Sequence, residues 1–349
     1  MSDVPHLRFP EFSGEWEKYT IGDLCEEFKS GKNIKAESIQ EEGVYPVFGG
    51  NGLRGYTDRY NHDGDYVLIG RQGALCGNVR FVTGKTYITE HAIAAKATND
   101  NYTRYLEYLF VRLNLGQFSD QSAQPGLAVN KLLKIETYVP SKAEQLKIAF
   151  LLRLLDERIA TQNKIIEKLE SLIKGIIETT ISSQKPNTLI KDCLECNSSI
   201  LQESQVAEYG AFPVYGATGI TGYTEAADVN GESILIIKDG SGVGTVKFVA
   251  GEYCYIGTLN SLTAKDGYCL KYIYFALQRF SFEPYKTGMA IPHIYFKDYG
   301  KAKIFCPNLK LQFEIAKELS NINDKIEVEK QILLCLQKQK LYLLSQLFL

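Results

Sequence analysis

Residues 45–57 read YPVFGGNGLRGYT, and residues 212–224 read FPVYGATGITGYT. The second stretch begins 167 positions after the first, and seven of the thirteen positions are identical. At the same spacing, residues 64–84 (GDYVLIGRQGALCGNVRFVTG) match residues 231–251 (GESILIIKDGSGVGTVKFVAG) at nine of twenty-one positions. Two blocks that share one spacing indicate that a whole structural unit is repeated. The chain therefore contains two copies of one fold.

The spacing of 167 residues also holds at the points where each globular segment meets a long segment of different character. Pro140 corresponds to Pro307, and Gln145 corresponds to Gln312. The repeat predicts four segments, which are a globular domain over 1–140, a central long segment over 141–184, a second globular domain over 185–307 and a C-terminal long segment over 308–349.

The two long segments carry apolar residues at the alternating spacing of four and three that is typical of a coiled-coil seam. Residues 141–183 contain no proline, and Gln162 interrupts the first seam, as Glu329 and Lys340 interrupt the second. About 40 helical residues would make a rod of roughly 60 Å, longer than the ordinary amphipathic core helices that are the alternative. We expect the two helices to pair through Ile148, Leu152, Leu155, Ile159, Ile166, Leu169, Ile315, Leu319, Ile322, Ile326, Leu333 and Leu336.

The globular segments combine strand-like and helix-like patterns. Short runs rich in β-branched or aromatic residues, bounded by glycine, occur at 66–69, 79–83, 234–238 and 245–250. The stretches YTRYLEYLFVRLN and CLKYIYFALQRF instead have apolar residues at helical spacing. These patterns predict an α+β domain that occurs twice.

The charge balance limits how the chain could contact nucleic acid. Lysine and arginine total 39 against 41 acidic residues, which gives a formal net charge of −2. This balance excludes the strongly basic surface by which many nucleic-acid-binding proteins are recognised. Any contact with DNA must come from local basic loops, or partner subunits must supply much of the charge that neutralises phosphates.

Further sequence features favour a cytoplasmic protein. No stretch approaches the roughly 20 apolar residues of a membrane span, and the opening residues MSDVPHLRFPEF lack the regions of a signal peptide. The eight cysteines are scattered, which favours free thiols in a reducing compartment. Cys193 and Cys196 form the single CxxC pair, and without a second pair they fit buried apolar side chains better than a zinc or redox site.

Patterns that approach enzyme signatures fall short of them. Gly84-Lys85-Thr86 would end a phosphate-binding P-loop, but Val79 stands where that motif needs its first glycine. Residues 48–52 (FGGNG) resemble the nucleotide loop of methyltransferases, yet no Asn-Pro-Pro-Tyr-like tetrapeptide is present. The four histidines form no metal-binding spacing. We therefore expect no catalytic centre, no metal site and no cofactor in this chain.

The repeated glycine-rich loops are the candidate DNA contacts. Glycine lets backbone amides approach phosphates, whereas arginine and glutamine can recognise guanine and adenine edges through paired hydrogen bonds. The frame is kept between the copies while Arg71, Gln72 and Asn78 are replaced by Lys238, Asp239 and Thr245, which suits two sites of different specificity. Tight turns with solvated charges are the alternative. The candidate contacts are Arg54, Arg71, Gln72, Asn78, Arg80, Lys85, Gln124, Asn130, Lys131, Lys238, Ser241, Thr245, Lys247, Lys286, Thr287, His293 and Tyr295.

Several stretches make the resemblance to a family specific. They are VPHLRFPEFSGEWEKYTIGDL near the start, QSAQPGLAVNKLLKIETYVPSKAEQLKIA before the first long helix and GMAIPHIYFKDYGKAKIFCPNLKLQFEIA before the second. Together with the order of domain, helix, domain and helix, the chain resembles the DNA specificity subunits of type I restriction-modification systems over essentially its whole length. The second copy departs from the first in having Leu311 where the first has Glu144.

This resemblance implies a division of labour within a larger complex. Each globular segment would be a target-recognition domain for one half of a bipartite, asymmetric sequence in double-stranded DNA. The helices would pair antiparallel as a spacer and dock two methyltransferase subunits, which bind S-adenosylmethionine, and a restriction subunit that translocates DNA would join separately. The chain itself would be non-catalytic. Three alternatives remain, namely a related system with one fused methyltransferase-nuclease partner, a stand-alone DNA methyltransferase, and a repeat scaffold that binds only protein.

Overall fold

The computed structural model describes residues 4–120 and 126–349. The chain divides into two compact units, a first unit of residues 1–162 with 332–349 and a second unit of residues 163–331. Helix α4 (Lys142–Ile177) begins in the first unit and ends in the second, whereas α8 (Leu309–Gln346) begins in the second and ends in the first. Each unit therefore holds one copy of the repeat, the start of the helix that follows it, and the end of the other helix.

The first unit is built on a four-stranded antiparallel sheet of order β2-β8-β5-β6. A second sheet of order β4-β3-β7 lies beyond it, and β1 pairs with β9. The apolar run YVLIG of β5 is buried at every residue, as expected for a central strand. The elements are β1 (Glu17–Thr20), α1 (Ile21–Leu24), β2 (Cys25–Ser30), β3 (Tyr45–Gly49), β4 (Gly52–Thr57), β5 (Tyr66–Gly70), β6 (Val79–Val82), β7 (Tyr87–Ile88), β8 (Ala92–Ala97), α2 (Thr103–Arg112), α3 (Val129–Leu132) and β9 (Glu136–Val139).

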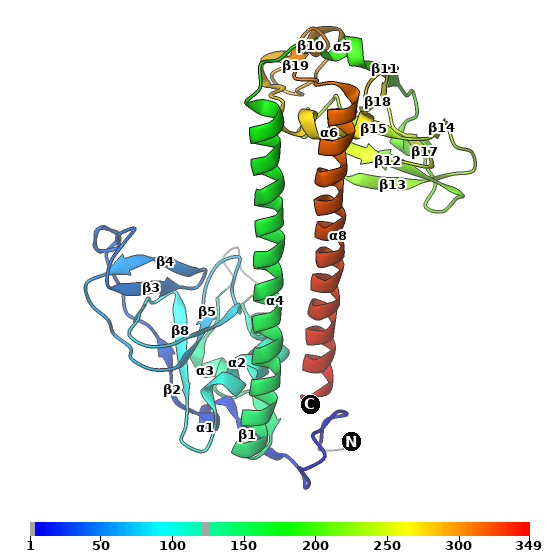
Figure 1. Cartoon of the computed structure of the whole chain (residues 1–349). Helices are drawn as coiled ribbons and strands as arrows, with labels where there is room; N and C mark the ends of the chain where they lie inside the picture. Colours follow the sequence, from blue (N-terminus) through cyan, green and yellow to red (C-terminus); the bar gives the residue numbers. More distant parts are fainter. Residues whose placement is uncertain (1–3, 121–125) are drawn as a thin grey trace. The chain divides into compact units, whose positions relative to one another are not determined.

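The second unit repeats this arrangement, with one additional short strand, β14, in its second sheet. Its four-stranded sheet has the order β11-β18-β15-β16, its second sheet the order β13-β12-β17-β14, and β10 pairs with β19. The expected repeated α+β architecture is confirmed (Figure 1). The elements are β10 (Thr188–Leu189), α5 (Ile190–Cys193), β11 (Leu194–Ser198), β12 (Phe212–Gly216), β13 (Gly219–Thr224), β14 (Val229–Asn230), β15 (Ser233–Ile237), β16 (Val246–Val249), β17 (Glu252–Tyr255), β18 (Leu259–Ala264), α6 (Leu270–Arg279), α7 (Phe296–Tyr299) and β19 (Lys303–Ile304).

The two long helices run side by side in opposite directions (Figure 1). Within the first unit, Lys340 Nζ lies 2.5 Å from Asp156 Oδ1, and within the second, Lys330 Nζ lies 3.5 Å from Glu170 Oε1. The expectation of two long helices in mutual contact is confirmed. A π-helical turn over Glu178–Ser182 continues α4, and Pro186, which cannot donate a backbone hydrogen bond, follows soon after.

The residues that form the expected seam lie on the inner faces of the helices. Ile159, Leu169, Ile322 and Leu333 are half-buried, and the other eight are buried. Ile148 and Leu152 belong to the hydrophobic core of the first unit, together with Tyr105 of α2. At this end the apolar stripe of α4 therefore packs against the domain that precedes it as well as against α8.

The core of each unit is completed by the end of the helix that started in the other unit. In the first unit, Phe348 is buried and its ring stacks on Tyr105 with 5.3 Å between the ring centroids. Leu344 and Leu347 belong to the same core. In the second unit, the positions that correspond to Leu344 and Phe348 are Ile177 and Ile181, and both are buried.

Identical residues at the helix starts form the same hydrogen bonds in both units. Gln145 Nε2 donates to Pro140 O at 3.0 Å, and Gln145 Oε1 accepts from the backbone N of Tyr102 at 3.0 Å. Gln312 Nε2 donates to Pro307 O at 2.8 Å, and its Oε1 accepts from Cys269 N at 3.0 Å. These two hydrogen bonds attach each long helix to its domain. They explain why glutamine and proline recur at the same spacing in both copies.

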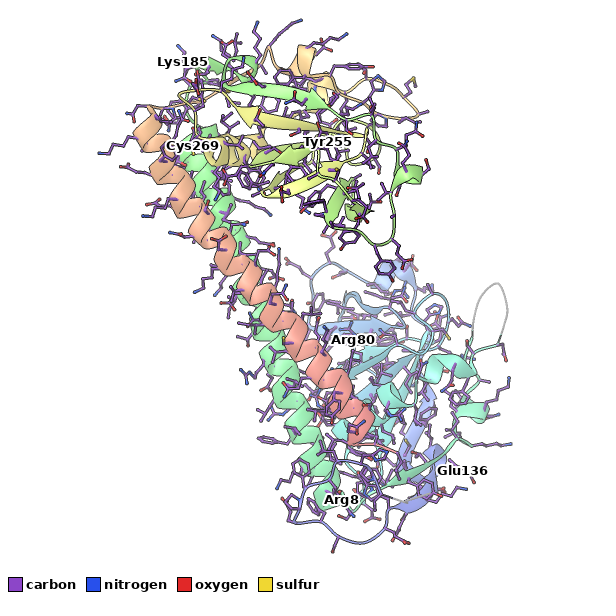
Figure 2. The ribbon with its side chains drawn as sticks, turned by 90° about the vertical axis from the view of Figure 1, so that its right-hand side faces the viewer. Arg8, Arg80, Glu136, Lys185, Tyr255 and Cys269 are labelled. Carbon is purple, nitrogen blue, oxygen red and sulfur yellow. The ribbon has the colours of Figure 1, made fainter. Side chains whose placement is uncertain are left out.

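The first unit adds an ion pair that the second lacks. Glu144 is 1% exposed, and its two carboxylate oxygens accept from Arg8 Nε and Nη2, each at 2.8 Å. Figure 2 shows Arg8 beside the start of α4. Leu311, which stands at the corresponding position in the second unit, is 39% exposed and needs no partner. Glu144 therefore anchors the N-terminal segment to the first long helix.

The first unit also contains a buried histidine with a carboxylate partner. His62 is 6% exposed, and its Nε2 lies 3.1 Å from Glu27 Oε1, whose second oxygen accepts from Tyr66 Oη at 3.2 Å. Burial lowers the pKa of His62 by more than the charge of Glu27 raises it. The second unit has Val229 at the corresponding position.

We expect the stability of the first unit to depend on pH. Because the pKa of His62 is lower in the folded chain than its ordinary value of about 6.5, the unfolded chain binds more protons below that pH. The contribution of neutral His62 to the free energy of unfolding is therefore complete above about pH 6.5. It decreases as the pH falls towards the lower pKa of the folded chain. Urea unfolding at pH 7.5 and 5.5, followed by the fluorescence of the single tryptophan, buried Trp16, measures the change. His62→Gln should reduce the difference in stability between the two pH values. An equal difference in the variant would show that His62 is not its cause.

Candidate nucleic-acid interface

The glycine-rich loop of the first unit connects β5 to β6 and is closed by its own backbone. Gly70 N donates to Asn78 O at 2.8 Å, and Gly77 N donates to Gly70 O at 2.7 Å. Gly77 adopts a φ of 85°, and a Cβ atom there would collide with the backbone of Gly116. The loop therefore requires glycine at this position and presents Gln72 and Asn78, which are exposed, from a fixed frame.

This loop is attached to the segment that precedes α3. Leu127 N donates to Arg71 O at 2.9 Å, and Gln72 forms a β-bridge with Gly126. His91 O accepts from Arg71 N at 2.9 Å, and the His91 Nδ1 and Gln72 Oε1 atoms lie 3.3 Å apart. Two stretches that sequence analysis treated as separate candidates thus lie next to each other. The candidate Gln124 lies outside the described residues.

The side chains of Arg54 and Arg80 lie at the turn between β3 and β4, and the backbone of Arg71 lies beside it. A Cβ on Gly49 would lie 2.9 Å from Arg54 Cδ, and one on Gly52 would lie 3.1 Å from Arg80 Nη2. Figure 2 shows Arg80 among the strands of the first unit. A Cβ on Gly50 would lie 3.6 Å from the backbone N of Arg71. Among the ion pairs found within residues 4–120 and 126–349, none involves Arg54, Arg71 or Arg80, so their charges are available to a ligand.

The second unit builds the same arrangement with different side chains. Ile237 N donates to Thr245 O at 3.0 Å and Gly244 N to Ile237 O at 2.9 Å, which closes the glycine-rich loop. Asp239 forms a β-bridge with His293, and Ile294 N donates to Lys238 O at 2.9 Å. The exposed candidates Ser241, Thr245 and Lys247 therefore share one loop assembly with the exposed Thr287 and half-buried His293.

Aromatic rings under two lysines were not identified as candidates from the sequence. Lys247 Nζ lies 4.8 Å from the ring centroid of Tyr215, and Lys85 Nζ lies 4.8 Å from that of Tyr60. Tyr215 stands in the repeated stretch FPVYG, so the repeat contained the signal. A lysine over an aromatic face gains about 0.5–1 kcal/mol at an exposed site, which restricts where its charge points.

Other candidates lie apart from the glycine-rich loops or already have charged partners. Lys85 follows β6 and is separated by that strand from the loop that precedes it. Lys131 Nζ lies 2.6 Å from Asp120 Oδ1, and Lys286 pairs with Glu283. Lys238 Nζ donates to Asp239 Oδ2 at 3.0 Å. The rings of His293 and Tyr295 are in contact, with 5.2 Å between centroids, and Asn130 is exposed on α3.

A search of the part of the chain that the structure describes finds no group of three or more His, Cys, Asp or Glu residues that could hold a metal ion. Cys193 and Cys306 are buried, and burial raises the pKa of Cys196 to about 11, so this thiol stays protonated near neutral pH. Within the same residues, no helix has the length and apolarity to cross a membrane.

Comparison with known proteins decides the family. A family model described as the type I restriction modification DNA specificity domain matches residues 13–171 and again residues 190–338. The chain belongs to this specificity family. Its two matches follow the two copies of the repeat, and each extends into the long helix that follows the domain.

Individual members of the specificity family align with one copy or with the whole chain. The EcoprrI specificity subunit of a type I restriction enzyme from Escherichia coli is 41% identical over 154 residues, which cover 43% of this chain and 38% of that subunit. A type I specificity subunit of Mycoplasma genitalium is 25% identical over 95% of this chain and 94% of its own. The crystal structure of an S subunit from M. genitalium matches with a TM-score of 0.78 at 20% identity, covering 99% of both chains.

The chain is accordingly a DNA specificity subunit, a non-catalytic component of a type I restriction-modification complex. The sequence-based identification of the family is confirmed, and so is the expectation that this subunit carries no catalysis of its own. The individual DNA contacts and the four domain boundaries stay predictions.

Proposed function

We propose that each unit recognises one half of a bipartite, asymmetric DNA sequence. The observation that carries this proposal is the repeated loop assembly, in which a glycine-rich loop is bridged to the segment before the next helix in both units. The frame is the same, but the first unit presents Arg71 and Gln72 where the second presents Lys238 and Asp239. Arginine favours guanine edges and glutamine favours adenine edges, whereas an aspartate accepts from cytosine. Two loop assemblies with the same backbone arrangement and different side chains suit two different half-sites.

The long helices serve as the spacer and as the docking surface for two methyltransferase subunits. Two corresponding positions support a pair of equal partners, since Leu146 at the start of α4 is 43% exposed and Phe313 at the start of α8 is 55% exposed. Exposed apolar side chains beside polar neighbours are typical of protein contacts. S-adenosylmethionine would bind to the methyltransferase subunits. Cleavage would come from a separate restriction subunit that joins the complex, or from a nuclease fused to the methyltransferase.

The partner subunits also account for the charge balance. With a formal net charge of −2, this chain cannot neutralise many phosphates over its whole surface. The unpaired Arg54, Arg71 and Arg80 in the first unit offer only a local contact. Phosphate contacts position a protein on DNA without conferring sequence information. We therefore assign base recognition to this chain and much of the phosphate contact to its partners.

Exchange of one domain tests the proposal. Residues 186–306 would be replaced by the equivalent domain of a related subunit, the chain co-expressed with its methyltransferase, and methylated adenines mapped across the genome. Only one half of the methylated sequence should change, because base contacts at well-separated positions contribute nearly additively. The other half-site, the spacer and the co-purified methyltransferase should stay the same. A change in both half-sites would show that the two units do not act independently.

Single alanine substitutions should separate base contacts from phosphate contacts. Arg71→Ala, Arg80→Ala and Lys247→Ala should each weaken DNA binding by the assembled complex, by about 1–3 kcal/mol if the residue contacts a base edge. Loss of a phosphate contact should instead lower the slope of log affinity against log salt by about 1. Fluorescence anisotropy of a labelled target duplex at several salt concentrations measures both quantities. Wild-type values for all three variants would refute this placement.

Lys85→Ala is the comparison for Arg80→Ala, because both residues lie on or directly after β6. Lys85 lies after β6, whereas Arg80 lies on β6 and contacts the β3–β4 turn. A loss equal to that of Arg80→Ala would mean that the DNA contact extends along the whole strand. A smaller loss would restrict the contact to the glycine-rich loop and the neighbouring turn.

A further inference from the structure

The second unit exposes two apolar side chains at the tip of the loop that precedes α7. Met289 has a relative exposed area of 106%, and Ile291 is 66% exposed. At the repeat spacing of 167, the sequence of the first copy has Ser122 and Gln124 at these positions. One exposed apolar residue is ordinary on a protein surface. Two at alternate positions, present in only one copy, indicate a feature that belongs to the specificity of that copy.

The tip is held in a defined conformation. Thr287 N donates to His293 O at 2.9 Å, and His293 N donates to Thr287 O at 2.8 Å, which closes the five residues between them. Gly288 has a φ of 86°, and a Cβ atom there would collide with the carbonyl of Ile291. A loop that is ordered before binding loses less conformational entropy when it contacts a ligand.

The same loop is attached directly to the glycine-rich loop. Gly240 N donates to Pro292 O at 2.9 Å, and Ile294 N donates to Lys238 O at 2.9 Å. The apolar tip therefore lies beside Lys238 and Asp239, the residues to which base recognition is assigned. In the major groove, the donors and acceptors of the base edges are accompanied by one apolar group, the 5-methyl group of thymine.

We infer that Met289 and Ile291 contact a thymine methyl group within the half-site that the second unit recognises. This inference rests on the proposed function, because it requires that the second unit lies against DNA. The apolar tip discriminates an A·T pair from a G·C pair at its position, while Lys238 and Asp239 contact neighbouring base edges. In the sequence of the first copy, the position that corresponds to Ile291 is a glutamine, Gln124, so the two copies differ in chemistry at this position of the repeat.

Removal of the methyl group from DNA tests the contact. The probe is a labelled duplex with the mapped target sequence, in which each thymine of the second half-site is replaced in turn by deoxyuridine, and the protein is the complex of the full chain with its methyltransferase. At one thymine the wild-type complex should bind about fourfold more weakly, which corresponds to the ~0.8 kcal/mol of one buried methyl-sized group. The double variant Met289→Ser, Ile291→Ser should bind the thymine duplex about as weakly and lose no further affinity with deoxyuridine.

The matched control is Met289→Leu with Ile291→Val, which keeps the apolar surface and should keep the response to deoxyuridine. Both residues are exposed, so both double variants should unfold at the wild-type urea concentration. Absence of a deoxyuridine effect in the wild type, or an unchanged effect in the serine variant, would overturn the inference. Loss of the methyltransferase in the serine variant, with intact DNA discrimination, would make the tip a protein contact and overturn it as well.

A duplex with a scrambled second half-site distinguishes failure of the proposed function from failure of the inference on Met289 and Ile291. If the wild-type complex binds the scrambled duplex as tightly as the target, the proposed function of the second unit fails. If it discriminates against the scrambled duplex but no thymine responds to deoxyuridine, only the assignment of Met289 and Ile291 fails.

Discussion

Phe348→Ala should destabilise the first unit by about 3–5 kcal/mol, the usual loss when a buried phenylalanine is truncated. The ring is 3% exposed and stacks on Tyr105, which is itself fully buried in the core of the first unit. Leu347, which is 2% exposed, packs in the same core, so Leu347→Ala should add about 2–5 kcal/mol. The double variant would lose an amount comparable to the whole stability of a typical domain.

Urea unfolding followed by the fluorescence of Trp16 measures this loss, because the only tryptophan lies in the core of the first unit. Leu349→Ala is the matched control, since Leu349 is adjacent in sequence but 39% exposed, and its effect should stay within about 0.5 kcal/mol. Equal unfolding midpoints for Phe348→Ala and Leu349→Ala would mean that the end of α8 does not contribute to this core.

Arg8→Ala should destabilise the first unit by about 3 kcal/mol, because it leaves the carboxylate of Glu144 buried without its cation. Glu144 is 1% exposed and Arg8 is 17% exposed, so the arginine lies at the rim and the carboxylate beneath it. The two nitrogen–oxygen distances of 2.8 Å describe a bidentate pair, the geometry in which removal of one partner costs most. The fluorescence of Trp16 during urea unfolding again gives the change.

The double variant Arg8→Ala, Glu144→Leu provides the control for the ion pair. The second copy has Leu311 at this position, so the helix start accepts a leucine. Replacement of both partners removes the uncompensated charge, and most of the lost stability should return. If the double variant is as unstable as Arg8→Ala alone, the loss arises from the aliphatic part of the arginine and not from its charge.

The long helices could be predicted from the sequence because their signal is periodic and repeated. The seam spacing and the absence of proline predicted two long helices in mutual contact, and α4 and α8 confirm that expectation. Periodicity shows which face of a helix is apolar, but it does not show what covers that face. Ile148 and Leu152 therefore fitted one continuous seam, although the structure places them in a domain core with Tyr105.

The central strand β8 illustrates why part of the fold was not predicted. Its sequence AIAAKA is rich in alanine, which favours helices in isolation, and it lacks the alternation of a half-exposed strand. It is a strand because β2 and β5 supply hydrogen-bonding partners on both of its edges. Strand formation depends more on such neighbours than on intrinsic preference.

The candidate site was also predicted in part. The repeat identified the glycine-rich loops because their frame is constant and their polar residues differ. The bridges from Gln72 to Gly126 and from Asp239 to His293 join segments that are far apart in sequence, so no local pattern could reveal them. Met289 and Ile291 were not predicted as DNA contacts, because apolar residues in a sequence are as typical of a buried core as of an exposed loop.

The exchange of helix ends between the units has a consequence for synthesis on the ribosome. The chain is made from its N-terminus, so α2 with Tyr105 emerges long before Leu344, Leu347 and Phe348, which cover it in the folded chain. Until those residues are translated, the first unit keeps an open apolar surface of the kind that chaperones bind and proteases attack. The second unit needs only the preceding end of α4 and can close as soon as its own residues are made. A cell would thus complete the second domain of this subunit before the first.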